Sequence, residues 1–224
     1  SVFYIAIIDV AKLDRLGMDP EKDGVMTTVC VKEACKDYQA KVTTAEGDTL
    51  DHRFAFSGID GVTFGPAMGH KAGKPVRKWY LYVAYGVYGD NARSDNDHNV
   101  ILRYDVSKWA KYETPVTFGQ VHTNGPARPG RKYFVYTVNT TWGVQNMAYD
   151  THTNRTFLAV YKGKKPGMPN YDLYAIDCSK RPLWASLKGV DYHRRRVRML
   201  SLADDGLRDE ASGTAGWRFK WGST

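Results

Sequence analysis

The chain has 224 residues, of which 42% are hydrophobic and 25% are charged, a balance typical of one globular domain. It contains no apolar run approaching the ~18 residues of a membrane-spanning helix, so we expect no membrane partner. Its 32 basic and 24 acidic side chains give a net charge of +8, which indicates an anionic partner. Because no helix-turn-helix, zinc-finger or RNP-type motif accompanies this charge, we expect an acidic polysaccharide or oligosaccharide and no nucleic acid.

The N-terminal part of the chain offers short strands separated by turn residues. Residues 1–12 contain an aliphatic run that resembles the run at 173–180, so we expect the two to form equivalent strands. The periodicity of residues 25–38 fits either a strand or a short helix, and we assign the first part of this segment to a strand. Residues 36–42, followed by Glu46, Gly47 and Asp48, are interpreted as a strand with a turn.

Two longer units, residues 51–109 and 130–180, are diverged copies of one pattern. Each unit contains about four short runs of β-branched and aromatic residues, in the same order and with turn residues between them. A four-stranded antiparallel sheet that is used repeatedly is typical of a β-propeller blade. The sequence therefore predicts an all-β propeller in which the loops between strands vary in length.

The C-terminal part contains a charged, loop-like region, residues 182–212, and then residues 213–224, which resemble the start of a further unit. We expect residues 213–224 and residues 1–12 to complete one blade together. Residues 1–224 are thus interpreted as a single, partial propeller domain. Propellers have about four to eight blades, so we expect a second chain or a further segment to complete the ring.

Chemistry on such a scaffold is expected in the loops that enter the innermost strands, because these loops converge at one mouth of the central channel. The aligned segments carry Asp60 in the first unit and Trp142, Gln145 and Asn146 in the second. Asp60 is a candidate general acid, base or nucleophile, and the other three are candidates for holding a sugar. The alternative for Asp60 is structural, since Asp-Gly is a strong turn signal.

The loop at residues 86–99 is the most polar segment of the chain. In a functional reading, Arg93 binds a substrate carboxylate and His98 transfers a proton. Asp95 and Asp97 offer oxygen ligands for calcium, the one cofactor that the sequence suggests, although the EF-hand pattern is absent. The alternative is a solvated loop without a site.

Histidine and tyrosine side chains suggest a second kind of chemistry. His98 or His122, paired with Tyr85, would suit β-elimination of a uronic-acid polysaccharide, in which one side chain removes a proton and the other protonates the leaving oxygen. Lys164, in a loop with Gly and Pro, is a candidate partner for a sugar carboxylate. The densest basic run is at residues 193–198, and it fits either an anionic ligand or a solvated surface.

The arrangement of strands and the segment Ser57–Phe64 resemble the sialidase-like and BNR-repeat propellers. The segment is close to the Asp-box Ser-x-Asp-x-Gly-x-Thr-Trp of these proteins, with one additional residue between Ser57 and Asp60, and the second unit lacks the aspartate. The resemblance covers about residues 51–180. This group includes glycoside hydrolases and polysaccharide lyases, so the resemblance implies a carbohydrate-active enzyme on a propeller.

Two functions follow from this reading. The first is a glycoside hydrolase or polysaccharide lyase that acts on an acidic or decorated glycan in an extracellular or periplasmic location. The second is a propeller that binds a glycan or a protein partner without catalysis. The enzyme requires two titratable groups within hydrogen-bond reach of one pocket, whereas the binding protein requires only aromatic and basic contacts.

Overall fold

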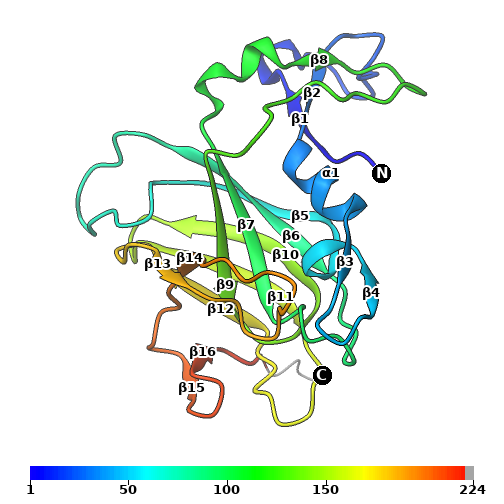
Figure 1. Cartoon of the computed structure of the whole chain (residues 1–224). Coiled ribbons are helices and arrows are strands. Elements are labelled where there is room, and N and C mark those ends of the chain that lie inside the picture. The colour runs from blue at the N-terminus through cyan, green and yellow to red at the C-terminus, as the bar shows by residue number, and fades with distance from the viewer. Residues whose placement is uncertain (220–224) are drawn as a thin grey trace, which may run out of the picture.

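The structure of the protein is a computed structural model that describes residues 1–219. Strands account for 40% of the chain and helices for 9%, which confirms the all-β prediction (Figure 1). The strands of the described residues form two central sheets and three smaller ones. Within residues 1–219, no helix has the length and apolar composition that crossing a membrane requires.

The larger central sheet has six strands, in the order β13, β14, β9, β7, β6 and β5. Only β14 and β9 run parallel, and every other neighbouring pair is antiparallel. The sequence-adjacent strands β5, β6 and β7, continued by β9, form an antiparallel meander. The bounds are β5 Phe56–Gly65, β6 Tyr80–Val87, β7 His98–Tyr104, β9 Arg131–Tyr136, β13 Leu183–Ala185 and β14 Val197–Leu200.

The smaller central sheet consists of β10 (Thr140–Asp150), β11 (Arg155–Lys162) and β12 (Leu173–Asp177), all antiparallel. Residues 201–203, which follow β14, pair with β12 and add a short fourth segment to this sheet. Its backbone hydrogen bonds join Asp177 N to Ser201 O at 3.0 Å and Ala203 N to Ala175 O at 2.8 Å. The chain that leaves the larger sheet at β14 therefore continues along the edge of the smaller one.

The two central sheets pack face to face through a shared apolar cluster. Tyr82, Ile101 and Val135 of the larger sheet contact Leu158 and Ile176 of the smaller sheet, and all five are buried. Strand β6 is buried on both faces, which fits its nearly unbroken apolar sequence. Each large apolar side chain that is fully buried in this way contributes roughly 1.5–3 kcal/mol to stability.

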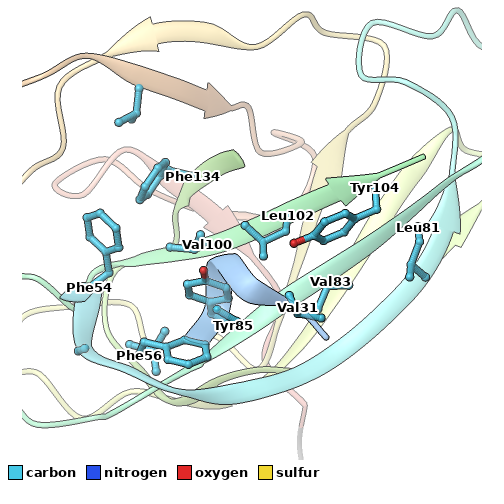
Figure 2. Close-up of a cluster of buried hydrophobic side chains, with 14 of the residues drawn as sticks. Val31, Phe54, Phe56, Leu81, Val83, Tyr85, Val100, Leu102, Tyr104 and Phe134 are labelled. Carbon is cyan, nitrogen blue, oxygen red and sulfur yellow. The ribbon is translucent and has the colours of Figure 1, made fainter. Parts of the chain in front are cut away.

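The opposite face of the larger sheet is covered by the N-terminal part of the chain. Figure 2 shows Val83, Tyr85 and Leu102 among the buried side chains of this second cluster, with Val31 beside them. Val31 directly precedes helix α1 (Lys32–Gln39), and Ala34 of that helix is fully buried in the same cluster. The six-stranded sheet is therefore the middle layer of the molecule.

Helix α1 corrects the strand that was predicted at residues 36–42. Its sequence contains the good helix formers Ala, Lys, Glu and Gln, and its contacts with β5 and the 3-10 segment Arg53–Ala55 add packing that the local pattern does not reveal. Only the end of the predicted range is extended, as β3 (Lys41–Thr43). This strand forms a hairpin with β4 (Thr49–Asp51).

The predicted strand at residues 1–12 is present as β1 (Tyr4–Ile8), followed by a 3-10 turn at Val10–Lys12. It pairs with β2 (Met26–Cys30), which in turn pairs with β8 (Thr114–Pro115) after the 3-10 segment Val106–Lys111. This small sheet lies at the top of Figure 1. The strand β2 confirms the strand predicted in the first part of residues 25–38.

The C-terminal residues lie elsewhere, at the lower end of Figure 1. They form the hairpin β15 (Leu207–Asp209) and β16 (Thr214–Gly216), and Trp217 then pairs with Leu173 at the end of β12. Neither this hairpin nor Trp217 pairs with β1, so the described residues do not form the blade expected from both termini. Residues 220–224 of the predicted final unit lie outside the described residues.

The described residues form no closed ring of blades. The turn predicted from the Asp-Gly pair, at residues 58–61, is also wrong, because these residues lie inside β5, which bulges between Phe56 and Gly58 and again between Ile59 and Val62. Strand β10 bulges twice at the corresponding place in the second unit. A bulge absorbs extra residues without ending a strand, so two predicted runs in each unit merge into one long strand.

Candidate functional site

The bulged half of β10 forms one wall of a surface cleft of about 640 Å3. This cleft brings together four residues predicted to bind substrate, namely Trp142, Gln145, Asn146 and Lys164. The remaining wall comes from β11 and from two segments distant in sequence. The side chains from these parts are Tyr161, Lys162, Asp172 and Phe219.

The backbone of β10 explains why Trp142 lies at the surface. Trp142 and Gly143 have φ values of 64° and 71°, so the strand leaves the regular pleat at the first bulge. A Cβ on Gly143 would lie 2.6 Å from the carbonyl oxygen of Tyr85 and from the amide nitrogen of Val87. Glycine at this position therefore permits the close approach of β10 to β6 that shapes the cleft.

Three aromatic side chains of the cleft are exposed to solvent. The exposed fractions are 50% for Trp142, 62% for Tyr161 and 52% for Phe219. The ring of Tyr88, which directly follows β6, meets that of Trp142 edge to face, with 6.1 Å between centroids. Exposed aromatic rings around a concave surface offer apolar faces for a ligand.

The polar side chains of the cleft are held by hydrogen bonds. Gln145 Nε2 donates to the carbonyl oxygen of Trp142 at 2.8 Å and to Asp60 Oδ2 at 3.3 Å. On the other side, the amide of Phe219 donates to Asp172 Oδ2 at 3.0 Å. Gln145 therefore connects the cleft to Asp60, the predicted catalytic carboxylate.

Asp60 is exposed as a residue, but its carboxyl group packs against β6, where a Cβ on Gly86 would overlap it. Burial of the carboxyl group raises its pKa, and the hydrogen bond from Gln145 opposes this rise. The carboxyl group is thus partly shielded from water beside the cleft. A shielded carboxyl group with a raised pKa has the property that a general acid requires.

The other predicted catalytic residues are not gathered at this cleft. His98, at the start of β7, is 2% exposed and packs against the ring of Tyr136. Tyr85 is fully buried, and its hydroxyl donates to Asp37 Oδ2 at 2.7 Å. The loop position expected for His98 is therefore wrong, because the polar segment that precedes it folds inward.

His122 lies in a different part of the molecule. Its Nδ1 is 2.8 Å from the hydroxyl of Thr28 in β2, and the residue is 9% exposed. Tyr85, by contrast, is held by Asp37 of α1 within the cluster on the larger sheet. These contacts do not pair His122 with Tyr85.

The loop at residues 86–99 is held by ion pairs. Arg93 Nε and Nη2 donate to the two oxygens of Asp95 at 2.8 and 2.9 Å, and Asp95 is 1% exposed. Lys165 Nζ donates to Asp97 Oδ1 at 2.7 Å and to Asn96 Oδ1 at 2.8 Å. Arg93 is thus engaged within the protein and not presented to a substrate carboxylate.

The same ion pairs argue against the calcium site that was predicted at Asp95 and Asp97. Each carboxylate is neutralised by a cationic side chain, which competes with a metal ion for the same oxygens. Within residues 1–219, no three His, Cys, Asp or Glu side chains are close enough together to hold a metal ion. The geometry of the described residues therefore does not supply a calcium site.

Comparison of the chain with protein-family models, with curated proteins and with solved structures gives no match. The functional argument therefore depends on the geometry of this chain. The sequence prediction missed Tyr161, Asp172 and Phe219 as cleft residues. For Tyr161 a signal was present, since it lies directly before Lys162 and Gly163 at the end of a strand, where side chains are often exposed.

Proposed function

We propose that this protein binds a glycan in the cleft between β10 and β11. The observation that supports this proposal best is the set of exposed aromatic rings, Trp142, Tyr161 and Phe219, around one concave surface. Faces of aromatic rings stack on the apolar faces of sugar rings, while amide side chains bond to hydroxyl groups. Gln145 and Asn146 supply such amides beside the rings.

The charges at the cleft favour an acidic or decorated glycan. Lys162 and Lys164 line the cleft together with one carboxylate, Asp172. An oxygen of Asp172 already accepts a hydrogen bond from the backbone of Phe219, so part of its charge is compensated. The two ammonium groups are thus available to a uronate or another acidic substituent.

A second candidate function is hydrolysis of the bound glycan, with Asp60 as the general acid. The raised pKa of its shielded carboxyl group and its contact with the cleft residue Gln145 support this alternative. Most glycoside hydrolases use a pair of carboxyl groups, and Asp172, which lines the cleft, would be the partner of Asp60. The lyase version has less support, because His98 and Tyr85 are enclosed in the interior.

The experiment that separates these functions is a screen of acidic and neutral polysaccharides for binding and for products. Affinity electrophoresis reports binding, reducing-end release reports hydrolysis, and ultraviolet absorbance reports unsaturated uronates. Retarded migration without products supports the binding protein. Products that disappear in Asp60→Asn support the hydrolase, and the absence of both binding and products contradicts the proposal.

We also propose that the two central sheets are neighbouring blades of a propeller. The meander β5, β6, β7 and β9 and the sheet of β10, β11, β12 and residues 201–203 each contain four antiparallel segments. Their first strands approach closely, since a Cβ on Gly61 would lie 3.1 Å from a methyl group of Val144. A ring completed by further copies predicts a mass of two or more chains by light scattering, and a monomer contradicts that version.

A further inference from the structure

A second cavity, separate from the glycan cleft, is lined by the first three residues of the basic run noted at residues 193–198. Its volume is about 660 Å3, and it lies between the β3–β4 hairpin, the 3-10 segment at Arg53 and the loop before β14. Four basic side chains line it, Arg53, His193, Arg194 and Arg195. The two cavities have no lining residue in common.

The acidic residue at this cavity is already engaged. Asp191 Oδ2 accepts a hydrogen bond of 2.7 Å from the backbone amide of Ala45, which also fastens the loop to the β3–β4 hairpin. Arg194 and Arg195 are exposed, and neither takes part in an ion pair with another residue in the 1–219 range. Their charges are thus free for a ligand.

The charges behind the cavity balance one another. Asp37 is fully buried and contacts Lys132, and Arg53 Nη1 lies 3.4 Å from its other oxygen. Lys132 Nζ also lies 3.1 Å from Glu33. These two acidic and two basic groups cancel, so the network does not neutralise Arg194 and Arg195.

The excess of positive charge around the cavity affects the pKa of His193. Burial lowers the pKa of its imidazole first, and the neighbouring charges of Lys132, Arg53 and Arg195 lower it further against the opposing effect of Asp37. A negatively charged ligand in the cavity would compensate these cations. His193 therefore provides a spectroscopic reporter for such a ligand.

The cavity is also fixed in shape before any ligand binds. Tyr192 Oη accepts a hydrogen bond of 2.9 Å from the amide of Phe54 and donates one of 2.6 Å to the buried carboxylate of Asp95. These contacts hold the loop before β14 against the segment that carries Arg53. A loop that is already anchored loses less entropy when it binds an anion than a mobile loop does.

We propose that this cavity binds a compact tetrahedral oxyanion, a phosphate or sulfate group. Guanidinium groups donate several hydrogen bonds in a planar fork, so Arg194 and Arg195 can hold such a group together, while Arg53, whose charge Asp37 balances, adds further N–H donors to the wall of the cavity. The volume leaves room for the small molecule that carries the group, for example a sugar ester. This proposal does not rest on glycan binding at the other cleft.

The test is a titration of the whole protein with inorganic phosphate, inorganic sulfate and a sugar phosphate, followed by NMR of the histidine side chains. His193→Gln identifies the reporter resonance, because it removes that signal alone. We expect saturable shifts of the His193 signal at constant pH and ionic strength. Tighter binding of the sugar phosphate identifies an ester as the ligand, whereas equal affinities identify the free ion.

The variant Arg194→Ala/Arg195→Ala is expected to weaken phosphate binding at least about tenfold, because two charge-assisted contacts are lost. Arg128→Ala/Arg208→Ala is the matched control, since it removes the same charge from exposed arginines that do not line the cavity. We expect affinity within about twofold of the parent for this control, as distant exposed charges are screened by salt.

Three results would overturn the proposal. One is a shift of the His193 signal that grows linearly with phosphate and does not saturate. Another is an equal loss of affinity in both double variants, which would indicate a general effect of net charge. The third is tight binding of single-stranded DNA that depends on Arg194 and Arg195 and that phosphate does not compete away.

Discussion

The buried imidazole of His98 predicts a specific loss of stability in mild acid. Both ring nitrogens are buried without a hydrogen-bond partner in the described part of the chain, and the residue is 2% exposed. Burial, with a smaller effect from Lys188, lowers its pKa from 6.5 to about 4. The folded protein therefore keeps this histidine neutral at a pH where the unfolded chain binds a proton.

The sign and size of the effect follow from this difference. Above pH 6.5 both states are neutral at His98 and no stability is lost, whereas between pH 6.5 and 4 the unfolded state gains a proton that the folded state lacks. Linkage then gives a loss of about 2 kcal/mol between pH 7 and 5, and of about 3 kcal/mol by pH 4. Other titrating groups also change the stability with pH, so the contribution of His98 is measured as the difference between the parent and a variant that lacks this histidine.

The assay is equilibrium unfolding in guanidinium chloride at a series of pH values for the parent and for His98→Leu, which fills a similar volume without titrating. We expect the parent to lose about 2 kcal/mol relative to His98→Leu between pH 7 and 5. His152→Leu is the control, because His152 is exposed. Parallel stability curves for the parent and His98→Leu would refute the reasoning, since they would mean that His98 ionises freely in the folded protein.

Two further substitutions test the framework of the site and of the core. Gly143→Ala places a Cβ against the backbone of Tyr85 and Val87 at a φ of 71°. We therefore expect the free energy of unfolding, measured with a chemical denaturant, to fall by about 2 kcal/mol or more. An unchanged unfolding midpoint would contradict the bulge geometry. Asp37→Asn removes the buried carboxylate that contacts Lys132 and leaves this ammonium with Glu33 at 3.1 Å, so we expect a loss of about 2–3 kcal/mol, and a loss below 1 kcal/mol would show that the pair is solvated.

The sequence predicted the central strands well because their residues carry the signal themselves. The runs that became β6, β7, β11 and β12 are rich in β-branched and aromatic residues, and their pairing needs no unusual backbone. The segment Ser57–Gly61 was misread, since its Asp-Gly pair resembles a turn. Only the pairing of β5 with β6 reveals that two bulges keep this segment within one strand.

Residues 182–212 show a second reason why strands were missed in the sequence. Strand β14 pairs with β9, which lies more than sixty positions earlier in the chain, and β13 in turn pairs with β14. Charged residues conceal this arrangement, as at Arg198, whose side chain stays partly exposed over the ring of Trp184 while its backbone pairs with Tyr133. Strands that depend on such long-range pairing carry little local signal.

The candidate site was predicted in part. The four proposed sugar-binding residues meet in one cleft because three lie on the same bulged strand and Lys164 follows the neighbouring strand. The acid and base groups were not predicted correctly as a set. Their positions depend on how the polar loop at residues 86–99 folds. Arg93 and Tyr192 supply hydrogen-bond partners for Asp95, so this carboxylate can be buried. His98 follows closely in the chain and is buried as well.

The most direct test of the central claim is the affinity of Trp142→Ala for the acidic polysaccharide that binds best in the screen. Removal of one stacking ring is expected to lower stabilisation of the complex by about 1–2 kcal/mol, or roughly five- to thirtyfold in affinity. Trp184→Ala is the matched control, because Trp184 is 51% exposed, against 50% for Trp142, and lies outside the cleft. A loss confined to Trp142→Ala is the predicted result, whereas equal affinities of both variants and the parent would contradict glycan binding at this cleft.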